Sequence, residues 1–345
     1  MKKIIDVSGF GHSGKSAVSE FLSDHEDFFM FPVHVEFELF RVSGGLLDLY
    51  YSIYHNWNLI RTRIALQNFQ KLLLRIGTIQ RKNSLSSLWK SSGHGYEQYF
   101  NNRFIELSEL YIKKLIVLEH ATFWPYEKLY LPQFQLFYEK AKGKFLKNLL
   151  TRKVIYTDRN IFLQETSNYI HSIFNEIEHK TASNIILNNA FEPFNPIACL
   201  EMVQNSYSII VDRDPRDVYA SLLGSGGRYV PGFEKDKVFD ELKKKIVGAD
   251  NIDDFILRFK TIKKNVELMD NPRILRLRYE DFVLSHKDSK EKIYQFLDII
   301  QPKKKSDFKF DPENSRKNIG LWKEYSDLPE IKKISTELAE FCYQK

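Results

Sequence analysis

The sequence predicts an α/β protein with a three-layer core, in which helices flank a central parallel sheet, plus a large, mostly helical insertion. Short apolar runs alternate with stretches of helical periodicity near both ends of the chain. A glycine-rich turn joins the first apolar run to the first helical stretch, and residues 45–180 carry long amphipathic segments instead. Strands that alternate with helices favour a parallel sheet covered on both faces.

Composition narrows the class of protein. The 345 residues fit one large α/β domain or about two domains, and 43% hydrophobic with 28% charged residues is typical of a globular chain. The two cysteines, Cys199 and Cys342, lie too far apart for a disulfide framework, a zinc ribbon or an iron–sulfur cluster. The net charge of +6 allows an anionic ligand but is too diffuse to indicate nucleic acid.

The start of the chain does not read as a targeting signal. Lys2 and Lys3 precede apolar residues, but Asp6 interrupts the run before a hydrophobic region of sufficient length forms. No stretch of 18 apolar residues occurs, so we expect no transmembrane helix and a cytoplasmic protein.

Five apolar runs predict strands, at 3–8, 33–41, 183–188, 207–212 and 273–279. Within 33–41, residues 33–39 alternate between apolar and other residues, which places His34, Glu36 and Glu38 on one face. Helical periodicity predicts helices at 15–23, 57–77, 97–120, 131–150, 161–180, 215–223, 234–246, 252–269, 287–299 and 328–343.

The strongest motif is a phosphate-binding loop, or P-loop. Residues 9–16 read GFGHSGKS, which matches the pattern GxxxxGK[ST] in full and lies between a predicted strand and a predicted helix. Its backbone N–H groups and the helix N-terminus would stabilise a phosphate, Lys15 would add a cation, and Ser16 a hydroxyl. We therefore expect a P-loop core with phosphate contacts from Gly11, His12, Ser13, Gly14, Lys15 and Ser16.

A second motif follows the strand at 207–212. Arg213 stands at the predicted strand tip and Ser221 two turns into the next helix, which Pro215 would begin, so both could reach one anion above the sheet edge. Taken alone, Asp212 at the end of an apolar strand could also be a Walker B residue that holds magnesium.

The segment from Arg213 to Ser221, RDPRDVYAS, resembles the 3′-phosphate-binding segment of sulfotransferases that use 3′-phosphoadenosine 5′-phosphosulfate (PAPS). Residues 9–16 then look like that family's 5′-phosphosulfate loop. RYEDF at 278–282 resembles the segment whose tyrosine, here Tyr279, lies near the adenine. SRKNIGLWK at 315–323 resembles the late segment that caps the 3′-phosphate. The resemblance implies a single sulfotransferase-like domain over 1–345, with 45–180 not covered and serving as an acceptor-binding subdomain.

Two features depart from the family pattern. The family's loop lysine precedes Ser-Gly, whereas His12 holds that place here and Lys15 follows the glycine, so both are candidates to stabilise the leaving group. In the late segment Asn318 replaces the usual glycine and the spacing to Gly320 is one residue short. Arg316 and Lys317 therefore both remain candidates for the 3′-phosphate.

The resemblance also bears on the catalytic base. Cytosolic relatives place a histidine at the tip of a middle strand, where this chain has Asn188 and Asn189, which cannot accept a proton. Glycan and tyrosyl-protein sulfotransferases instead place a glutamate shortly after the loop helix, a position that Glu36 resembles. A carboxylate is chemically adequate for this step, and Glu38 and His34 are the rivals.

Together these features imply an O-sulfotransferase that takes PAPS as sulfuryl donor, needs no metal, and acts on a glycan or glycolipid hydroxyl, or alternatively on a sterol or other lipid alcohol. The rival classes are an ATP-dependent P-loop kinase or NTPase and a non-catalytic nucleotide-binding protein. No basic stripe with interleaved aromatics favours nucleic acid. The basic segment 60–82 is either a solvated face or a peripheral membrane contact. The oligomeric state stays open.

Overall fold

The computed structural model describes the chain in two compact units. One comprises Met1–Glu38 with His179–Lys345 and the other Leu39–Glu178. The described residues are 1–32, 35–79, 94–146, 151–179, 181–191, 193, 196–224, 251–267, 270–300, 303 and 305–344. His34, the predicted helix at 234–246 and part of the basic segment 60–82 lie outside them.

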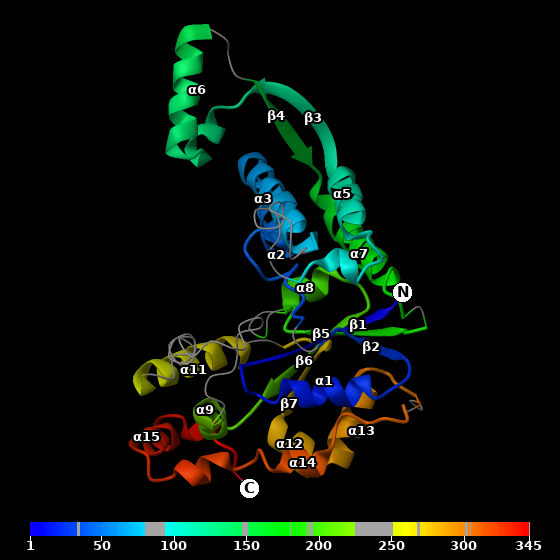
Figure 1. Ribbon diagram of the computed structural model, residues 1–345, viewed down its shortest axis with the longest axis vertical. Helices are drawn as coiled ribbons and strands as arrows, with labels where there is room; N and C mark the ends of the chain where they lie inside the picture. The colour runs from blue at the N-terminus through cyan, green and yellow to red at the C-terminus, as the bar shows by residue number, and fades with distance from the viewer. Residues whose placement is uncertain are drawn as a thin grey trace. The chain divides into compact units, whose positions relative to one another are not determined.

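The first unit is built on a five-stranded parallel sheet with the order β2-β5-β1-β6-β7 (Figure 1). Central strand β1 pairs with β5 through Ile5 and Ile186 and with β6 through Val7 and Ile209. Inner strands of this kind are buried on both faces and therefore read as continuous apolar runs. The strand bounds are β1 Lys3–Gly9, β2 Phe28–Met30, β5 Asn184–Asn188, β6 Ser206–Asp212 and β7 Ile274–Arg278.

Helices cover both faces of this sheet, which confirms the predicted three-layer α/β core. On one face Val18 and Phe21 of α1 pack with Val7, Ile209 and Val211. On the other, Ile210 packs with Val266 of α11. The helices of this unit are α1 Lys15–Ser23, α8 Ile197–Met202, α9 Pro215–Gly224, α11 Ile252–Glu267, α12 Tyr279–Leu284, α13 His286–Phe296, α14 Pro312–Arg316, η4 Leu321–Tyr325, α15 Pro329–Glu337 and η5 Ala339–Phe341.

The predicted strand at 33–41 is wrong. Strand β2 covers only Phe28–Met30, and residues 38–41 form turns. Pro32, which has no N–H group to donate to a neighbouring strand, follows β2 closely. The alternation nevertheless survives in burial, since Val35 and Phe37 are buried while Glu36 between them is partly exposed. The alternation of apolar and polar residues therefore predicted which side chains are buried, although the segment is irregular and does not pair as a strand.

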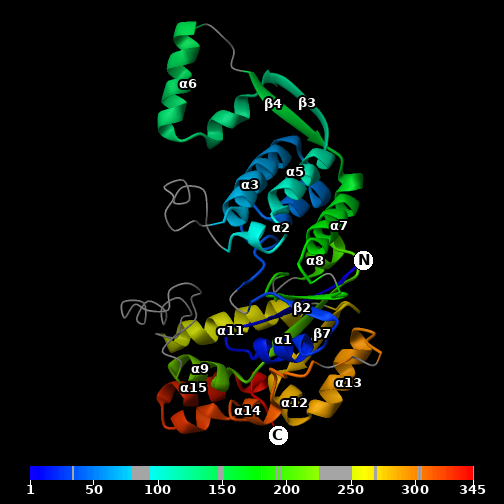
Figure 2. The same cartoon turned by 45° about the vertical axis from the view of Figure 1, so that its right-hand side comes forward.

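The second unit is mostly helical, as predicted, and three of its helices, α3, α5 and α7, lie side by side (Figures 1 and 2). Tyr111 of α5 stacks on Tyr169 of α7 at 4.5 Å between ring centroids and donates or accepts a 2.7 Å hydrogen bond with Thr166. Much of the aromatic content of the insertion is therefore core. The elements are α2 Leu46–Leu49, η1 Tyr50–His55, α3 Leu59–Gly77, η2 Tyr96–Gln98, α5 Phe104–Leu115, β3 Ile116–Phe123, η3 Pro125–Tyr130, α6 Gln133–Leu146, β4 Thr151–Thr157 and α7 Arg159–Asn175.

An antiparallel strand pair corrects the prediction of a helix over 97–120. Helix α5 ends at Leu115, and β3 then pairs with β4, with Ala121 opposite Lys153. The segment begins with β-branched Ile116 and Val117, which favour a strand. Its partner lies more than 30 residues further along the chain, so local periodicity could not reveal the pairing.

Helix α3 contains most of the described part of the basic segment 60–82, and one face of the helix is buried. Arg63 is buried, and its Nε donates a 3.0 Å hydrogen bond to the carbonyl oxygen of Lys153. Leu66 and Phe69 on the same helix are buried as well. One face of α3 therefore belongs to the core of the unit. Among the described helices, none combines the length and the apolar character that a bilayer span requires.

Buried Asp6 in β1 makes the stability of the fold depend on pH. Burial raises the pKa of this carboxyl from 3.8 to about 6, against opposing hydrogen bonds from Ser8 and from the N–H groups of Ala190 and Phe191. Because the folded-state pKa is the higher one, the stabilisation is fully present below about pH 4 and is lost as the pH rises through 6. A difference of about two pKa units corresponds to about 3 kcal/mol.

We expect Asp6→Asn to remove this dependence. Between pH 4 and 7, the free energy of unfolding of the wild type should fall by up to about 3 kcal/mol relative to that of the variant, because only the wild type must ionise a buried carboxyl. Urea titrations followed by circular dichroism at several pH values measure the difference. The exposed Asp27→Asn is the control, and parallel pH profiles for wild type and Asp6→Asn would contradict the prediction.

Candidate functional site

The P-loop connects the end of β1 to the start of α1. Gly14 caps α1 in the left-handed conformation with φ 85°, and His12 is also left-handed with φ 64°. Left-handed residues in such a turn orient successive N–H groups toward one side and form a concave anion site. At Gly9, a Cβ atom would lie 2.5 Å from the carbonyl oxygen of Val211, so the loop can approach β6 only with glycine there. The local structure is thus the one that a phosphate cradle requires.

Arg213 and Ser221 both meet this loop at His12. Arg213 Nη1 donates a 2.8 Å hydrogen bond to the carbonyl oxygen of His12, and its Nη2 donates to the carbonyl oxygen of Asn318. Ser221 Oγ lies 2.9 Å from His12 Nδ1. The structure therefore brings together the two motifs that the sequence placed about 200 residues apart.

His12 and Lys15 differ in charge. Burial, with Arg213 and Lys15 as neighbouring cations, lowers the pKa of the His12 imidazole below its ordinary value of 6.5. At neutral pH the imidazole is therefore uncharged. Lys15 is buried at the start of α1 and supplies a positive charge at the loop.

Glu36 lies beside the loop lysine. Its Oε1 is 3.6 Å from Lys15 Nζ and accepts a 3.3 Å hydrogen bond from Asn189 Nδ2. Asn189 also accepts a 3.3 Å hydrogen bond from the N–H of Gly9 through Oδ1, so one side chain links the P-loop to the carboxylate. Glu38, the rival base, is partly exposed, and the rival His34 is not among the described residues.

Tyr279 supports the loop from the side of α12. Its ring is buried and fits against Gly14, where a Cβ atom would lie 2.2 Å from Tyr279 Cδ2. The guanidinium of Arg213 lies 5.2 Å from the ring centroid, and the phenol donates a 2.9 Å hydrogen bond to the carbonyl oxygen of Ser315. Tyr279 thus packs the loop, the arginine and the late segment together.

Arg316 and Lys317 are exposed and make local contacts. Arg316 Nη1 lies 3.5 Å from Glu313, and Lys317 Nζ donates a 3.3 Å hydrogen bond to Asn314 Oδ1. The late segment contacts Arg213 through the backbone carbonyl of Asn318, and the contacts of the Arg316 and Lys317 side chains given above are with other residues.

Sequence reasoning missed Asp217 and the linking role of Asn189. Asp217 in the first turn of α9 accepts hydrogen bonds from the N–H groups of Gly320 at 2.8 Å and Trp322 at 3.1 Å, and so fixes the late segment beside Arg213. Burial raises the pKa of this carboxyl. An acidic residue in a first helical turn usually signals only a helix N-terminus, so the sequence held no sign of these distant partners.

Asp212 is engaged elsewhere. Its Oδ2 lies 2.8 Å from Nζ of the buried Lys263 on α11. A carboxylate neutralised by a lysine is a poor ligand for magnesium, so the geometry does not favour the Walker B interpretation.

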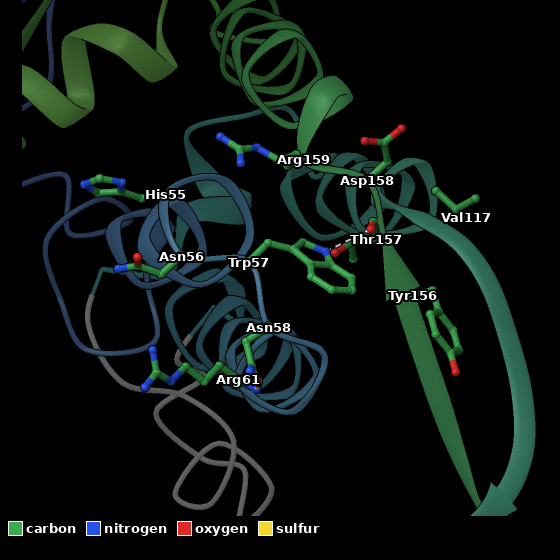
Figure 3. A pocket seen from close by; sticks show the side chains of 10 residues that line it. All are labelled: His55, Asn56, Trp57, Asn58, Arg61, Val117, Tyr156, Thr157, Asp158 and Arg159. Carbon is green, nitrogen blue, oxygen red and sulfur yellow. Dashed lines mark hydrogen bonds between the residues drawn. The ribbon is translucent and has the colours of Figure 1, made fainter.

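The second unit contains a pocket of about 720 Å³ at the N-terminal ends of α3 and α7 (Figure 3). Trp57 is half-exposed there, and its Nε1 donates a 3.1 Å hydrogen bond to the carbonyl oxygen of Thr157, which fixes the indole. Asn58 and Asp158 cap the two helices. The remaining lining residues are His55, Asn56, Arg61, Val117, Tyr156 and Arg159.

Comparison with known families supports one class of protein. Residues 191–318 match the family described as "Sulfotransferase domain". This match confirms the resemblance to sulfotransferases that the motifs predicted, and the matched segment contains Arg213, Ser221, Tyr279, Arg316 and Lys317. The P-loop and Glu36 precede the segment. No curated protein sequence matches the chain significantly.

Three solved structures are similar to this chain at low identity. The sulfotransferase domain from the curacin biosynthetic pathway has 14% identity and a TM-score of 0.37, with 98% of both chains covered. A sulfotransferase from Mycobacterium tuberculosis H37Rv has 11% identity and a TM-score of 0.39, over 99% of this chain and 77% of that one. Retinol dehydratase in complex with androsterone and inactive cofactor PAP has 13% identity and a TM-score of 0.35, over 98% and 80%.

The packing of Tyr279 predicts that Gly14→Ala destabilises the fold. A Cβ atom at this left-handed position would meet the Tyr279 ring, so we expect a loss of about 1–3 kcal/mol in the free energy of unfolding, measured by urea denaturation without ligand. Gly11→Ala is the matched control, because a Cβ atom there has no neighbour within 4 Å. Equal losses in the two variants would show that the contact with Tyr279 is unimportant.

Proposed function

We propose that the protein is an O-sulfotransferase that transfers the sulfuryl group of PAPS to an acceptor hydroxyl. The observation that supports this most is the meeting of Arg213 and Ser221 with the P-loop at His12. A second anion-binding pair beside the loop would suit a donor with two separate phosphate groups. The sulfotransferase-domain match over residues 191–318 supports the same function.

In this proposal the loop from Gly11 to Ser16 binds the 5′-phosphosulfate, and Arg213 and Ser221 bind the 3′-phosphate. Arg213 is buried, so a charge-assisted hydrogen bond from it would be strong. Arg316 or Lys317 would close over the same phosphate from the exposed side of the late segment. Tyr279 acts mainly as a support, because its ring already fills the space between Gly14 and Arg213.

Glu36 is the proposed catalytic base, and Lys15 is the proposed cation that stabilises the leaving group. The acceptor oxygen attacks sulfur, the bond from sulfur to the bridging phosphate oxygen breaks, and its electron pair remains on the departing 5′-phosphate. Glu36 accepts the hydroxyl proton, and Lys15 stabilises the charge on the leaving group. The 3.6 Å separation of Lys15 Nζ and Glu36 Oε1 beside the loop supports these two roles. Lys15 is the better cation because His12 is neutral at ordinary pH.

A P-loop kinase or NTPase is the main rival, and a non-catalytic nucleotide-binding protein is the next. The first would need magnesium, and the pairing of Asp212 with Lys263 argues against it. Thermal shifts with adenosine 3′,5′-bisphosphate plus EDTA, with ATP–Mg and with AMP separate these classes. The sulfotransferase should prefer the bisphosphate without metal.

We propose a glycan or glycolipid acceptor, with a sterol or other lipid alcohol as the alternative. The pocket of the second unit supports a sugar, because it combines the fixed indole of Trp57 with amides and charged side chains from Asn56, Asn58, Arg61 and Arg159. An aromatic face with surrounding hydrogen-bonding groups suits sugar rings, which have apolar faces and polar edges. The second unit would thus select the acceptor.

Glu36→Gln should abolish most sulfuryl transfer. We expect the transfer rate from PAPS to fall by about 10²–10⁴-fold, because the amide cannot accept the proton, while binding of adenosine 3′,5′-bisphosphate stays within a few-fold. Single-turnover assays and isothermal titration calorimetry measure the two quantities. Glu38→Gln is the control and should retain the rate. If Glu38→Gln lost activity and Glu36→Gln did not, the base would be misassigned.

Arg213→Ala should weaken adenosine 3′,5′-bisphosphate far more than AMP. Loss of a charge-assisted hydrogen bond to the 3′-phosphate predicts a decrease of about 10- to 100-fold in affinity for the bisphosphate. Damage to the loop itself, which Arg213 also contacts at His12, would affect both ligands. The ratio of the two dissociation constants is therefore the readout, and an unchanged ratio would show that Arg213 does not bind the 3′-phosphate.

A further inference from the structure

Exposed apolar side chains gather in one segment of the second unit. Eight of the 18 large hydrophobic side chains that are exposed among the described residues fall between positions 117 and 138. We call these eight the arm surface. They are contributed by β3, η3 and α6 and comprise Val117, Leu118, Tyr126, Leu129, Tyr130, Phe134, Phe137 and Tyr138. Single exposed apolar residues are ordinary, but this many within one short stretch of the chain mark the stretch as a candidate for an interaction with a partner.

Helix α6, Gln133–Leu146, carries the most regular part of the arm surface. Phe134, Phe137 and Tyr138 follow the spacing i, i+3, i+4, which places them on one face of the helix. Phe134 is 71% exposed and Phe137 76% exposed, so this apolar face is turned to solvent rather than to a core. Figures 1 and 2 show α6 apart from the packed helices α3, α5 and α7.

The sequence of α6 and of the residue that follows it is basic. By helical spacing, Gln133 and Lys140 border the apolar stripe next to Phe137. From 133 to 147 the sequence contains four lysines, at 140, 142, 144 and 147, and one acidic residue, Glu139. A segment that combines an exposed aromatic face with an excess of lysines in its sequence is typical of segments that lie in the interface of a bilayer.

The η3 segment, Pro125–Tyr130, adds side chains of the same kind. Leu129 is 78% exposed, and Tyr126 and Tyr130 are exposed beside it. Tyrosine is favoured at membrane interfaces because its ring meets the acyl region while its hydroxyl stays among the headgroups. Leucine and phenylalanine side chains suit the acyl region of a bilayer, and tyrosines suit its boundary with the headgroups, so the segment has the composition of a membrane-interface contact.

The positive charge of the α6 segment favours an anionic bilayer over a second copy of this chain as the partner of the arm surface. Two copies of this chain that met through the arm surface would bring two lysine-rich segments together, and like charges in contact are unfavourable. An anionic bilayer offers the opposite charge, with each lysine near its surface contributing about 1 kcal/mol.

We propose that the arm surface docks the protein on an anionic lipid bilayer, with the apolar face of α6 and the η3 side chains inserted among the headgroups. The contact is peripheral, and it lies on a different segment from the basic run at 60–82. The inference does not depend on the proposed sulfuryl transfer, since it rests on exposure and charge alone.

Vesicle sedimentation tests the proposal. The full-length protein should bind vesicles of phosphatidylcholine with 30% phosphatidylserine, at about 10-fold higher partition coefficient than vesicles of phosphatidylcholine alone. The double variant Phe134→Ser/Phe137→Ser should lose at least 10-fold in binding to the anionic vesicles. Lys140→Glu should weaken binding to the anionic vesicles and leave binding to the neutral ones unchanged.

The double variant Leu257→Ser/Ile300→Ser is the matched control, because it removes side chains that are 66% and 84% exposed in the first unit. It should bind vesicles like the wild type, and unchanged melting temperatures would show that all variants fold. The proposal is overturned if the wild type ignores anionic vesicles or if Phe134→Ser/Phe137→Ser binds as well as the wild type. It is also overturned if sedimentation equilibrium reveals a dimer that this variant abolishes, since the surface would then join two copies.

Discussion

The candidate site depends on the guanidinium group of Arg213. Its terminal nitrogens donate to two carbonyl oxygens, one of His12 in the P-loop and one of Asn318 in the late segment, which lie 201 and 105 residues away along the chain. Because a planar guanidinium presents several donors in fixed directions, it can hold two loops in one arrangement. The ring of Tyr279 packs against the guanidinium, and Asp217 holds the late segment by accepting a hydrogen bond from the N–H of Gly320. Together with the contacts of Ser221 with His12 and of Tyr279 with Gly14 and Ser315, Arg213 joins the P-loop, α9 and the late segment.

The parallel sheet explains why these loops meet at all. Strands β1, β5 and β6 run in the same direction, so the segments that follow them emerge at one edge. Those segments carry the P-loop, Asn189 and Arg213. Asn189 then connects Gly9 to Glu36, which places a carboxylate within 3.6 Å of the loop lysine. The same topology that forms the core therefore brings a carboxylate beside the P-loop.

The two units divide the chemistry of the chain between them. The first carries the P-loop, Arg213 and Glu36, all within residues that form one compact body. In the roles proposed above, the second would bind larger partners through the pocket around Trp57 and the arm surface on β3, η3 and α6. Placing recognition in an insertion leaves the sheet and its loops unchanged when the partner differs.

The sequence alone determined the strands β1, β5, β6 and β7, the helices beside them, and the two motifs at Gly9–Ser16 and Arg213–Ser221, because these depend on local periodicity and on residues with special chemistry. Only the tertiary structure decided that residues 35–41 form no strand, that β3 pairs with β4, and that Asp217 and Asn189 fix the site. Each of these depends on a partner far away in the chain. Local patterns report which side of a residue is buried, but they carry no information about which distant group will face it.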